Sequence, residues 1–210
     1  MTNHPQGMLG VLYIISAPSG AGKTTLVKSV TDTMQGVEIS ISYTTRPPRQ
    51  GEREGVNYHF VDKAQFDDML SRDAFLEHAN VYDYCYGTSR DYVLERLRQG
   101  IDVILEIDWQ GAQQVRKALP GCVTVFILPP SRDALAERLR SRGLDTDEVI
   151  QRRLREAVNE MSHCREYDYL IVNDDFPRAA ADLSAILAVH RLSQRYQSVS
   201  LDSLLRSLLG

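Results

Sequence analysis

The sequence predicts an α/β fold in which a parallel β-sheet lies between two layers of helices. Short apolar, β-branched runs typical of buried strands alternate along the chain with stretches of helical periodicity. The first of these runs leads directly into a glycine-rich turn and then a helix. The 210 residues are 43% hydrophobic and show no repeat or linker, so we expect a single domain with a substantial core.

The glycine-rich turn, residues 16–25, has the composition of a phosphate-binding loop. It follows the strand predicted at 11–15 and opens the helix predicted at 23–30. Gly20 and Gly22 permit backbone angles that turn successive N–H groups into one concavity, where the helix N-terminus adds positive potential. The residues expected to bind the nucleotide here are Ala17, Pro18, Ser19, Gly20, Ala21, Gly22, Lys23, Thr24 and Thr25.

Two polar side chains of this turn indicate the ligand. Lys23 can reach the β- and γ-phosphates as a point charge, and the Thr24 hydroxyl is a hard oxygen ligand suited to Mg²⁺. The predicted ligand is therefore a nucleoside triphosphate with magnesium. The full pattern G-x-x-x-x-G-K-[ST] has glycine where this chain has Ala17, and alanine costs little there unless the position needs a positive φ.

The next part of the chain is less regular. A short strand is expected at 37–41, followed by an irregular stretch rich in proline and arginine at 42–52. A strand expected at 56–61 leads into a helix that begins with a capping box at Asp62 and ends near Leu70. We interpret the irregular stretch as a functional insertion.

The second half of the chain alternates more regularly. Strands are predicted at 102–108, 122–128 and 169–172. Helices are predicted at 90–99 after a Ser89 cap, at 109–120, at 132–142, from Thr146, from Phe176 and from Ser200. The last of these, a leucine-rich tail, is expected to pack back on the core. The 102–108 strand ends in Glu106 and Asp108, as a Walker B strand does, so one of these carboxylates should face the metal and the phosphates.

Charge and composition exclude several classes of protein. A net charge of −4 and a pI near 5.7 argue against a general polyanion binder, so nucleic acid is not expected as a partner. No apolar run approaches the ~18 residues of a membrane span, and the N-terminus lacks a signal-peptide pattern. The protein is therefore predicted to be cytoplasmic and to have no membrane partner, whether it is a monomer or a homo-oligomer.

Four motifs, taken in order, resemble those of the guanylate kinases. They are Ser19-Gly20-Ala21-Gly22-Lys23, Thr44-Thr45-Arg46-Pro47-Pro48-Arg49-Gln50-Gly51-Glu52, Tyr84-Cys85-Tyr86-Gly87-Thr88 and Ile107-Asp108-Trp109-Gln110-Gly111. The resemblance covers residues 10–197. It implies that ATP gives its γ-phosphoryl group to GMP, and also to dGMP, in purine nucleotide metabolism. It further implies a P-loop core (1–41, 98–130 and 165–210), a mixed α+β insertion that binds GMP (42–97) and a helical lid (131–164).

The resemblance also implies a role for individual residues. The clamp on the GMP phosphate corresponds to Arg46, Arg49, Tyr58 and Tyr86. The residues that read guanine correspond to Ser42, Glu77, Thr88 and Asp108, where Thr88 replaces a common serine. Arg142 and Arg153 correspond to lid arginines that act in catalysis with Lys23 and Arg46, and Asn173 lies where the family holds adenine. Thr24 would ligate Mg²⁺, and Glu106, in place of a common aspartate, would contact the ion through water.

The chemistry of guanine favours this assignment over two alternatives. Guanine presents two adjacent N–H donors that one carboxylate such as Glu77 can accept, whereas adenine presents an acceptor to it. A kinase for another phosphorylated acceptor, such as ribose 1,5-bisphosphate, would not need that carboxylate. A non-catalytic guanylate-kinase-like module that binds phosphopeptides would have lost the phosphate loop, but Lys23 and Thr24 are intact.

Overall fold

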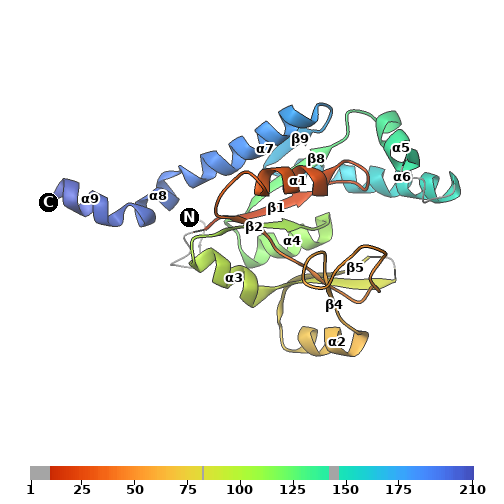
Figure 1. Cartoon of the computed structure of the whole chain (residues 1–210), viewed down its shortest axis with the longest axis horizontal. Coiled ribbons are helices and arrows are strands. Elements are labelled where there is room, and N and C mark those ends of the chain that lie inside the picture. Colours follow the sequence, from red (N-terminus) through yellow and green to blue (C-terminus); the bar gives the residue numbers. More distant parts are fainter. Residues whose placement is uncertain (1–9, 82, 142–146) are drawn as a thin grey trace.

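The computed structural model describes residues 10–81, 83–141 and 147–210 (Figure 1). Its centre is a parallel sheet with the strands in the order β2 (Val37–Ile39), β7 (Asp102–Glu106), β1 (Leu12–Ser16), β8 (Val123–Leu128) and β9 (Tyr169–Val172). β1 lies in the middle, paired with β7 and β8. The carboxyl ends of all five strands therefore meet at one edge, which is where open α/β sheets bind their ligands.

Helices cover both faces of this sheet, as the sequence predicts. The side chains of β1 alternate, so that Tyr13 and Ile15 face one helical layer and Leu12 and Ile14 face the other, all at most 1% exposed. The first layer consists of α1 (Lys23–Thr31) and α7 (Phe176–Arg191), and the second of α3 (Arg90–Arg98) and α4 (Trp109–Ala118). The expected three-layer α/β/α sandwich is confirmed (Figure 1).

A smaller mixed sheet lies beside the second helical layer. Its strands, in order, are β4 (His59–Phe60), β3 (Tyr43–Thr44), β6 (Tyr84–Ser89) and β5 (Phe75–Val81). Helix α2 (Lys63–Ser71) begins with the expected capping box at Asp62 and packs on this sheet through stacked Phe66 and Phe75 rings. The strand predicted at 56–61 is shorter than expected because the preceding residues form a turn in which the Arg53 N–H binds the Asn57 side chain.

A helical pair stands at the opposite end of the core from the C-terminus (Figure 1). It consists of α5 (Arg132–Ser141) and α6 (Asp147–Ser162), which share a small core of Leu135, Leu139, Ile150 and Ala157. Just beyond α6, the His163 ring stacks on Trp109 at the start of α4, with ring centroids 3.8 Å apart. A 3₁₀ turn (Cys164–Glu166) then leads into β9. Arg142 and Thr146 lie outside the described residues.

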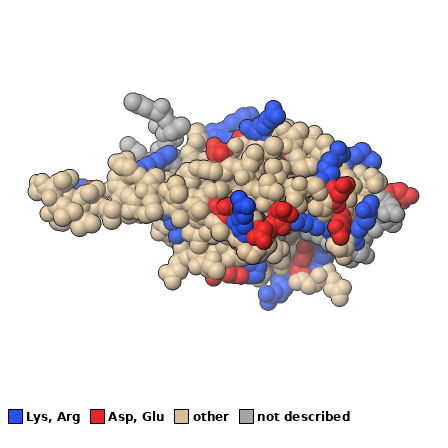
Figure 2. Space-filling view, turned by 90° about the horizontal axis from the view of Figure 1, so that it is seen from above, with Lys and Arg blue, Asp and Glu red and all other residues tan. Residues whose placement is uncertain are grey.

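The prediction that the C-terminal tail packs back on the core is wrong. Helix α8 (Gln194–Ser200) is anchored through the buried Tyr196, but α9 (Asp202–Leu209) buries none of its residues. It is a helix, as expected, yet Leu209 is 82% exposed. The nearby face of the sheet is already covered by α1 and α7. In Figures 1 and 2 the tail projects from the body of the molecule.

No helix in the described parts of the chain combines the length and the apolar character needed to cross a membrane.

Removing residues 202–210 should change the free energy of unfolding by less than about 0.5 kcal/mol, because these side chains are already exposed. Leu187→Ala, which empties a fully buried site on α7, should cost about 2–5 kcal/mol. Urea denaturation of both variants would measure the difference. A truncation as destabilising as Leu187→Ala would contradict the exposed position of α9.

Candidate active site

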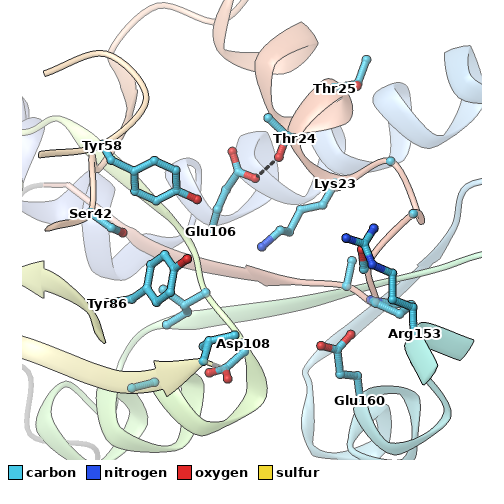
Figure 3. Close-up of a pocket in the computed structure, with 18 of the residues that line it drawn as sticks. Lys23, Thr24, Thr25, Ser42, Tyr58, Tyr86, Glu106, Asp108, Arg153 and Glu160 are labelled. Atoms are coloured by element: carbon cyan, nitrogen blue, oxygen red, sulfur yellow. Dashed lines mark hydrogen bonds between the residues drawn. The ribbon is translucent and has the colours of Figure 1, made fainter. Parts of the chain in front are cut away.

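A cavity of about 430 Å³ lies at the carboxyl edge of the parallel sheet, within the usual size range of small-molecule sites. The loop between β1 and α1, the smaller sheet and α6 enclose it (Figure 3). The predicted nucleotide-binding residues on its wall are Ala17, Pro18, Ser19, Gly20, Gly22, Lys23, Thr24, Thr25, Ser42, Arg49, Tyr58, Glu77, Tyr86, Glu106, Asp108 and Arg153. Residues far apart in the sequence thus meet around one space.

The glycine-rich loop has the backbone that a phosphate cradle needs. Gly20 (φ 94°) and Gly22 (φ 89°) both lie in the left-handed region that favours glycine. Gly22 caps α1, and its carbonyl accepts the Leu26 N–H at 3.0 Å. Among the described residues, Asp73 is the one non-glycine residue with positive φ, so Ala17 avoids that region. The alanine at this position is therefore compatible with the loop, as expected.

The side chain of Asn173 supports the glycine-rich loop. This side chain is 5% exposed, and its amide nitrogen donates to the Ala21 carbonyl at 2.8 Å. The Arg138 guanidinium in turn donates to the Asn173 carbonyl at 2.9 Å. A Cβ on Gly22 would approach the Asn173 amide nitrogen to 2.5 Å, so the close fit also requires glycine there. Neither Asn173 nor Ala21 lines the cavity, and contact between Asn173 and adenine stays a prediction.

The predicted metal-binding residues meet at the start of α1. The Thr24 hydroxyl donates to Glu106 Oε2 at 2.8 Å (Figure 3). Both oxygens are hard ligands of the kind that Mg²⁺ prefers, so this donor set fits the ion. No cluster of three or more His, Cys, Asp or Glu side chains suited to a metal occurs among the described residues. A magnesium ion here would therefore keep most of its coordination for water and substrate phosphates.

A buried carboxyl group forms the far end of the cavity. Glu77 on β5 is 4% exposed, and Thr88 lies opposite it on β6 and donates its hydroxyl proton to Glu77 Oε1 at 2.6 Å. Burial raises the pKa of Glu77 to about 7, the Thr88 hydrogen bond opposes this shift, and the nearby Asp108 adds to it. The remaining oxygen, Oε2, can accept hydrogen bonds from a ligand.

The N-terminus of α4 approaches this carboxyl group very closely. Asp108 caps the helix by accepting the Gly111 N–H at 2.9 Å. A Cβ on Gly111 would lie only 2.6 Å from Glu77 Oε2. The sequence motif that contains Gly111 does not reveal this close approach, because the contact joins residues that are distant in the sequence.

The arginine-rich loop is organised by Glu52, for which the sequence alone indicates no role. Arg46 is 7% exposed and binds both carboxylate oxygens of Glu52, at 2.8 and 2.9 Å. Its guanidinium carbon lies 5.3 Å from the centre of the Tyr58 ring. The Arg49 N–H donates to Glu52 Oε2 at 2.8 Å. Arg49 and Tyr58 line the cavity, whereas Arg46 does not.

Helix α6 contributes two charged side chains from the opposite wall. Arg153 and Glu160 both reach the cavity beside Lys23 (Figure 3). The sequence predicts a role at the site for Arg153 but not for Glu160. Arg142, the other predicted lid arginine, lies outside the described residues.

Comparisons with known proteins agree with this geometry. A family model described as guanylate kinase matches residues 10–190. Guanylate kinase from Alkalilimnicola ehrlichii is 58% identical over 97% of this chain and 100% of its own length. Guanylate kinase from Pseudomonas fluorescens strain Pf0-1 is 56% identical over 96% of this chain and 98% of its own length. The crystal structure of guanylate kinase from Anaplasma phagocytophilum superposes with a TM-score of 0.78 at 33% identity and covers 95% of each chain.

Gly111→Ala should push the Glu77 carboxyl group out of place and raise the KM for the predicted acceptor, GMP, about tenfold or more. The KM for ATP should stay within twofold, because the phosphate loop is not involved. Steady-state kinetics would measure both constants, and thermal unfolding would verify the fold. An unchanged KM for GMP would contradict the close approach.

Proposed function

The chain belongs to the guanylate kinase family and transfers the γ-phosphoryl group of ATP to GMP, and we propose that the cavity described above is where the two nucleotides meet. The observation that supports this site most directly is the pairing of two features in one space. The phosphate cradle lies at one end of the cavity, and the buried Glu77–Thr88 pair lies at the other. The phosphate cradle suits a triphosphate, and the Glu77–Thr88 pair suits a base with adjacent N–H donors.

We place ATP at the loop between β1 and α1, where backbone N–H groups and Lys23 would bind the β- and γ-phosphates. Mg²⁺ would be held by the Thr24 hydroxyl, with Glu106 contacting it through water. When bound, the ion neutralises charge on the phosphates and helps to align them. Asn173 would support the loop and border the adenine.

We place GMP between the smaller sheet and the start of α4. The guanine-reading set is Ser42, Glu77, Thr88 and Asp108, and the phosphate clamp is Arg46, Arg49, Tyr58 and Tyr86. The ionised Glu77 would accept the N1 and N2 hydrogens of guanine, whereas it would repel the N1 lone pair of adenine. Buried Arg46, held by Glu52, would supply a fixed positive charge behind the phosphate. Because none of these contacts needs the ribose 2′-hydroxyl, dGMP is a proposed second acceptor.

Catalysis in this proposal rests on position and charge. Lys23, Arg46, Arg142 and Arg153 would stabilise the transferring phosphoryl group, for which one arginine can contribute about 10³ to 10⁵ in rate. Water competes with GMP as acceptor. We therefore propose that the lid (131–164) and the insertion (42–97) close on the core (1–41, 98–130 and 165–210) only when both nucleotides are bound. We further propose that the enzyme acts in the cytoplasm, without a nucleic-acid or membrane partner.

An assay of ADP release with Mg·ATP and a panel of acceptors would test the proposed site. We expect fast turnover with GMP and dGMP and little with AMP, CMP, UMP or ribose 1,5-bisphosphate. Glu77→Ala should raise the KM for GMP at least a hundredfold, since a site built around buried polar groups depends on them strongly, and should leave ATP binding intact. Unchanged GMP kinetics in Glu77→Ala would refute the guanine-reading role.

GMP use should also depend on pH through Glu77. Its pKa is raised to about 7, so the carboxylate that accepts the guanine donors is the minor form below that pH and the major form above it. The ionised fraction rises about tenfold between pH 6 and pH 8, and the KM for GMP should fall to match.

Initial-rate measurements across this pH range, repeated with Glu77→Gln, would separate Glu77 from the GMP phosphate, which titrates near pH 6. The step near pH 7 in the wild-type pH profile of the KM for GMP should be absent from the profile of Glu77→Gln. The same step persisting in Glu77→Gln would assign it to another group.

A further inference from the structure

Gln114 on α4 is a half-buried residue to which the proposed reaction gives no role. Its side-chain amide forms two hydrogen bonds with the backbone of a single residue of β5, His78. The amide nitrogen donates to the His78 carbonyl at 2.7 Å, and the amide oxygen accepts the His78 N–H at 3.1 Å. The side chain thus satisfies both backbone polar groups of that residue.

This contact takes the place of a neighbouring strand. β5 is the last strand in the order of the smaller sheet, so its outer edge faces α4 instead of another strand of that sheet. Backbone N–H and C=O groups at such an edge need partners from outside the sheet. At His78 the Gln114 amide binds them as the backbone of another strand would. β5 is thereby attached to α4, and so to the core, at this position.

The attachment lies directly beside Glu77, whose carboxyl group forms one end of the cavity. The pairing of β5 with β6 shifts register between Phe75 and Glu77, and an irregularity of this kind re-aims a side chain. Thr88 on β6 binds Oε1 of Glu77. Oε2 lies against Gly111, which is three residues before Gln114 on the same side of α4. The position of Oε2 therefore depends on how closely β5 is held to α4.

We propose that Gln114 is a positioning residue for guanine recognition: by fixing β5 against α4 at His78, it sets the place of the Glu77 carboxylate. The inference rests on the proposed function, since it assumes that Glu77 accepts the N1 and N2 hydrogens of guanine. Gln114 does not line the cavity, so it acts through Glu77 and not by contact with the nucleotide. Accepting two adjacent donors at once demands a more exact position of the carboxylate than accepting one does.

The test compares GMP with inosine monophosphate (IMP), which has the N1–H of guanine but lacks its 2-amino group. The ratio of kcat/KM for GMP to kcat/KM for IMP measures what the second donor contributes. The variant is Gln114→Met, which keeps the length of the side chain and a high helix propensity but loses the amide. The control is Gln113→Met, because the amide of this neighbouring half-buried glutamine binds Glu166, at 3.1 Å, instead of β5.

We expect the GMP-to-IMP ratio to fall about tenfold in Gln114→Met, through a higher KM for GMP, since a shift of about 1 Å can cost about 10² in rate. The ratio should stay within twofold of wild type in Gln113→Met, and the KM for ATP within twofold in both variants. A loss of folded protein would lower the rates with both acceptors equally and would leave the ratio unchanged. If Gln114→Met does not fold, Gln114→Ala, which also lacks the amide, replaces it in the same comparison.

An unchanged ratio in the Gln114 variant, or an equal fall in Gln113→Met, would overturn the proposal. A wild-type preference for GMP over IMP would in that case still support the guanine-reading role of Glu77. A wild-type ratio near one would instead contradict that role, and this inference with it, so the two hypotheses fail in different ways.

Discussion

The parallel pairing of β1 with β7 is the constraint on which the site depends. It sets Ile15 opposite Glu106, so the phosphate loop begins beside the carboxylate that binds Thr24. Strand side chains alternate with a period of two, and a slip of one residue would turn Glu106 toward the opposite face of the sheet. The buried side chains of β1, packed on both faces, prevent that slip. Core packing therefore fixes the position of the proposed metal ligands.

Features encoded by local sequence were predictable. The Asp62 capping box, the Ser89 cap and the two glycines of the phosphate loop all have the expected geometry, because each depends on residues a few positions apart. Features that depend on contacts between distant residues could not be predicted from the sequence. The strands β5 and β6 carry mixed polar and aromatic side chains without a strong hairpin signal. The leucine-rich sequence of α9 is typical of a helix that packs on a core, but whether a core face is free for it depends on distant parts of the chain.

The same contrast between local and long-range features applies to the candidate active site. Resemblance supplied most of the cavity-lining residues, but Glu52, Gly111 and Glu160 gain their meaning from contacts made only in three dimensions. In the sequence, Glu160 is one of several charges on an arginine-rich helix, where a solvated ion pair is the ordinary interpretation. Folding instead places it on the wall of the cavity that Lys23 and Arg153 also line.

The stack of Trp109 on His163 gives the molecule its own spectroscopic label. Trp109 is the single tryptophan of the chain, and it lies directly after Asp108, while His163 directly follows α6. A rotation of α6 relative to α4 would change the overlap of these rings and, with it, the quenching of indole emission by the imidazole. The proposed closing of the lid on the core would therefore be visible in the unmodified protein, without an attached dye.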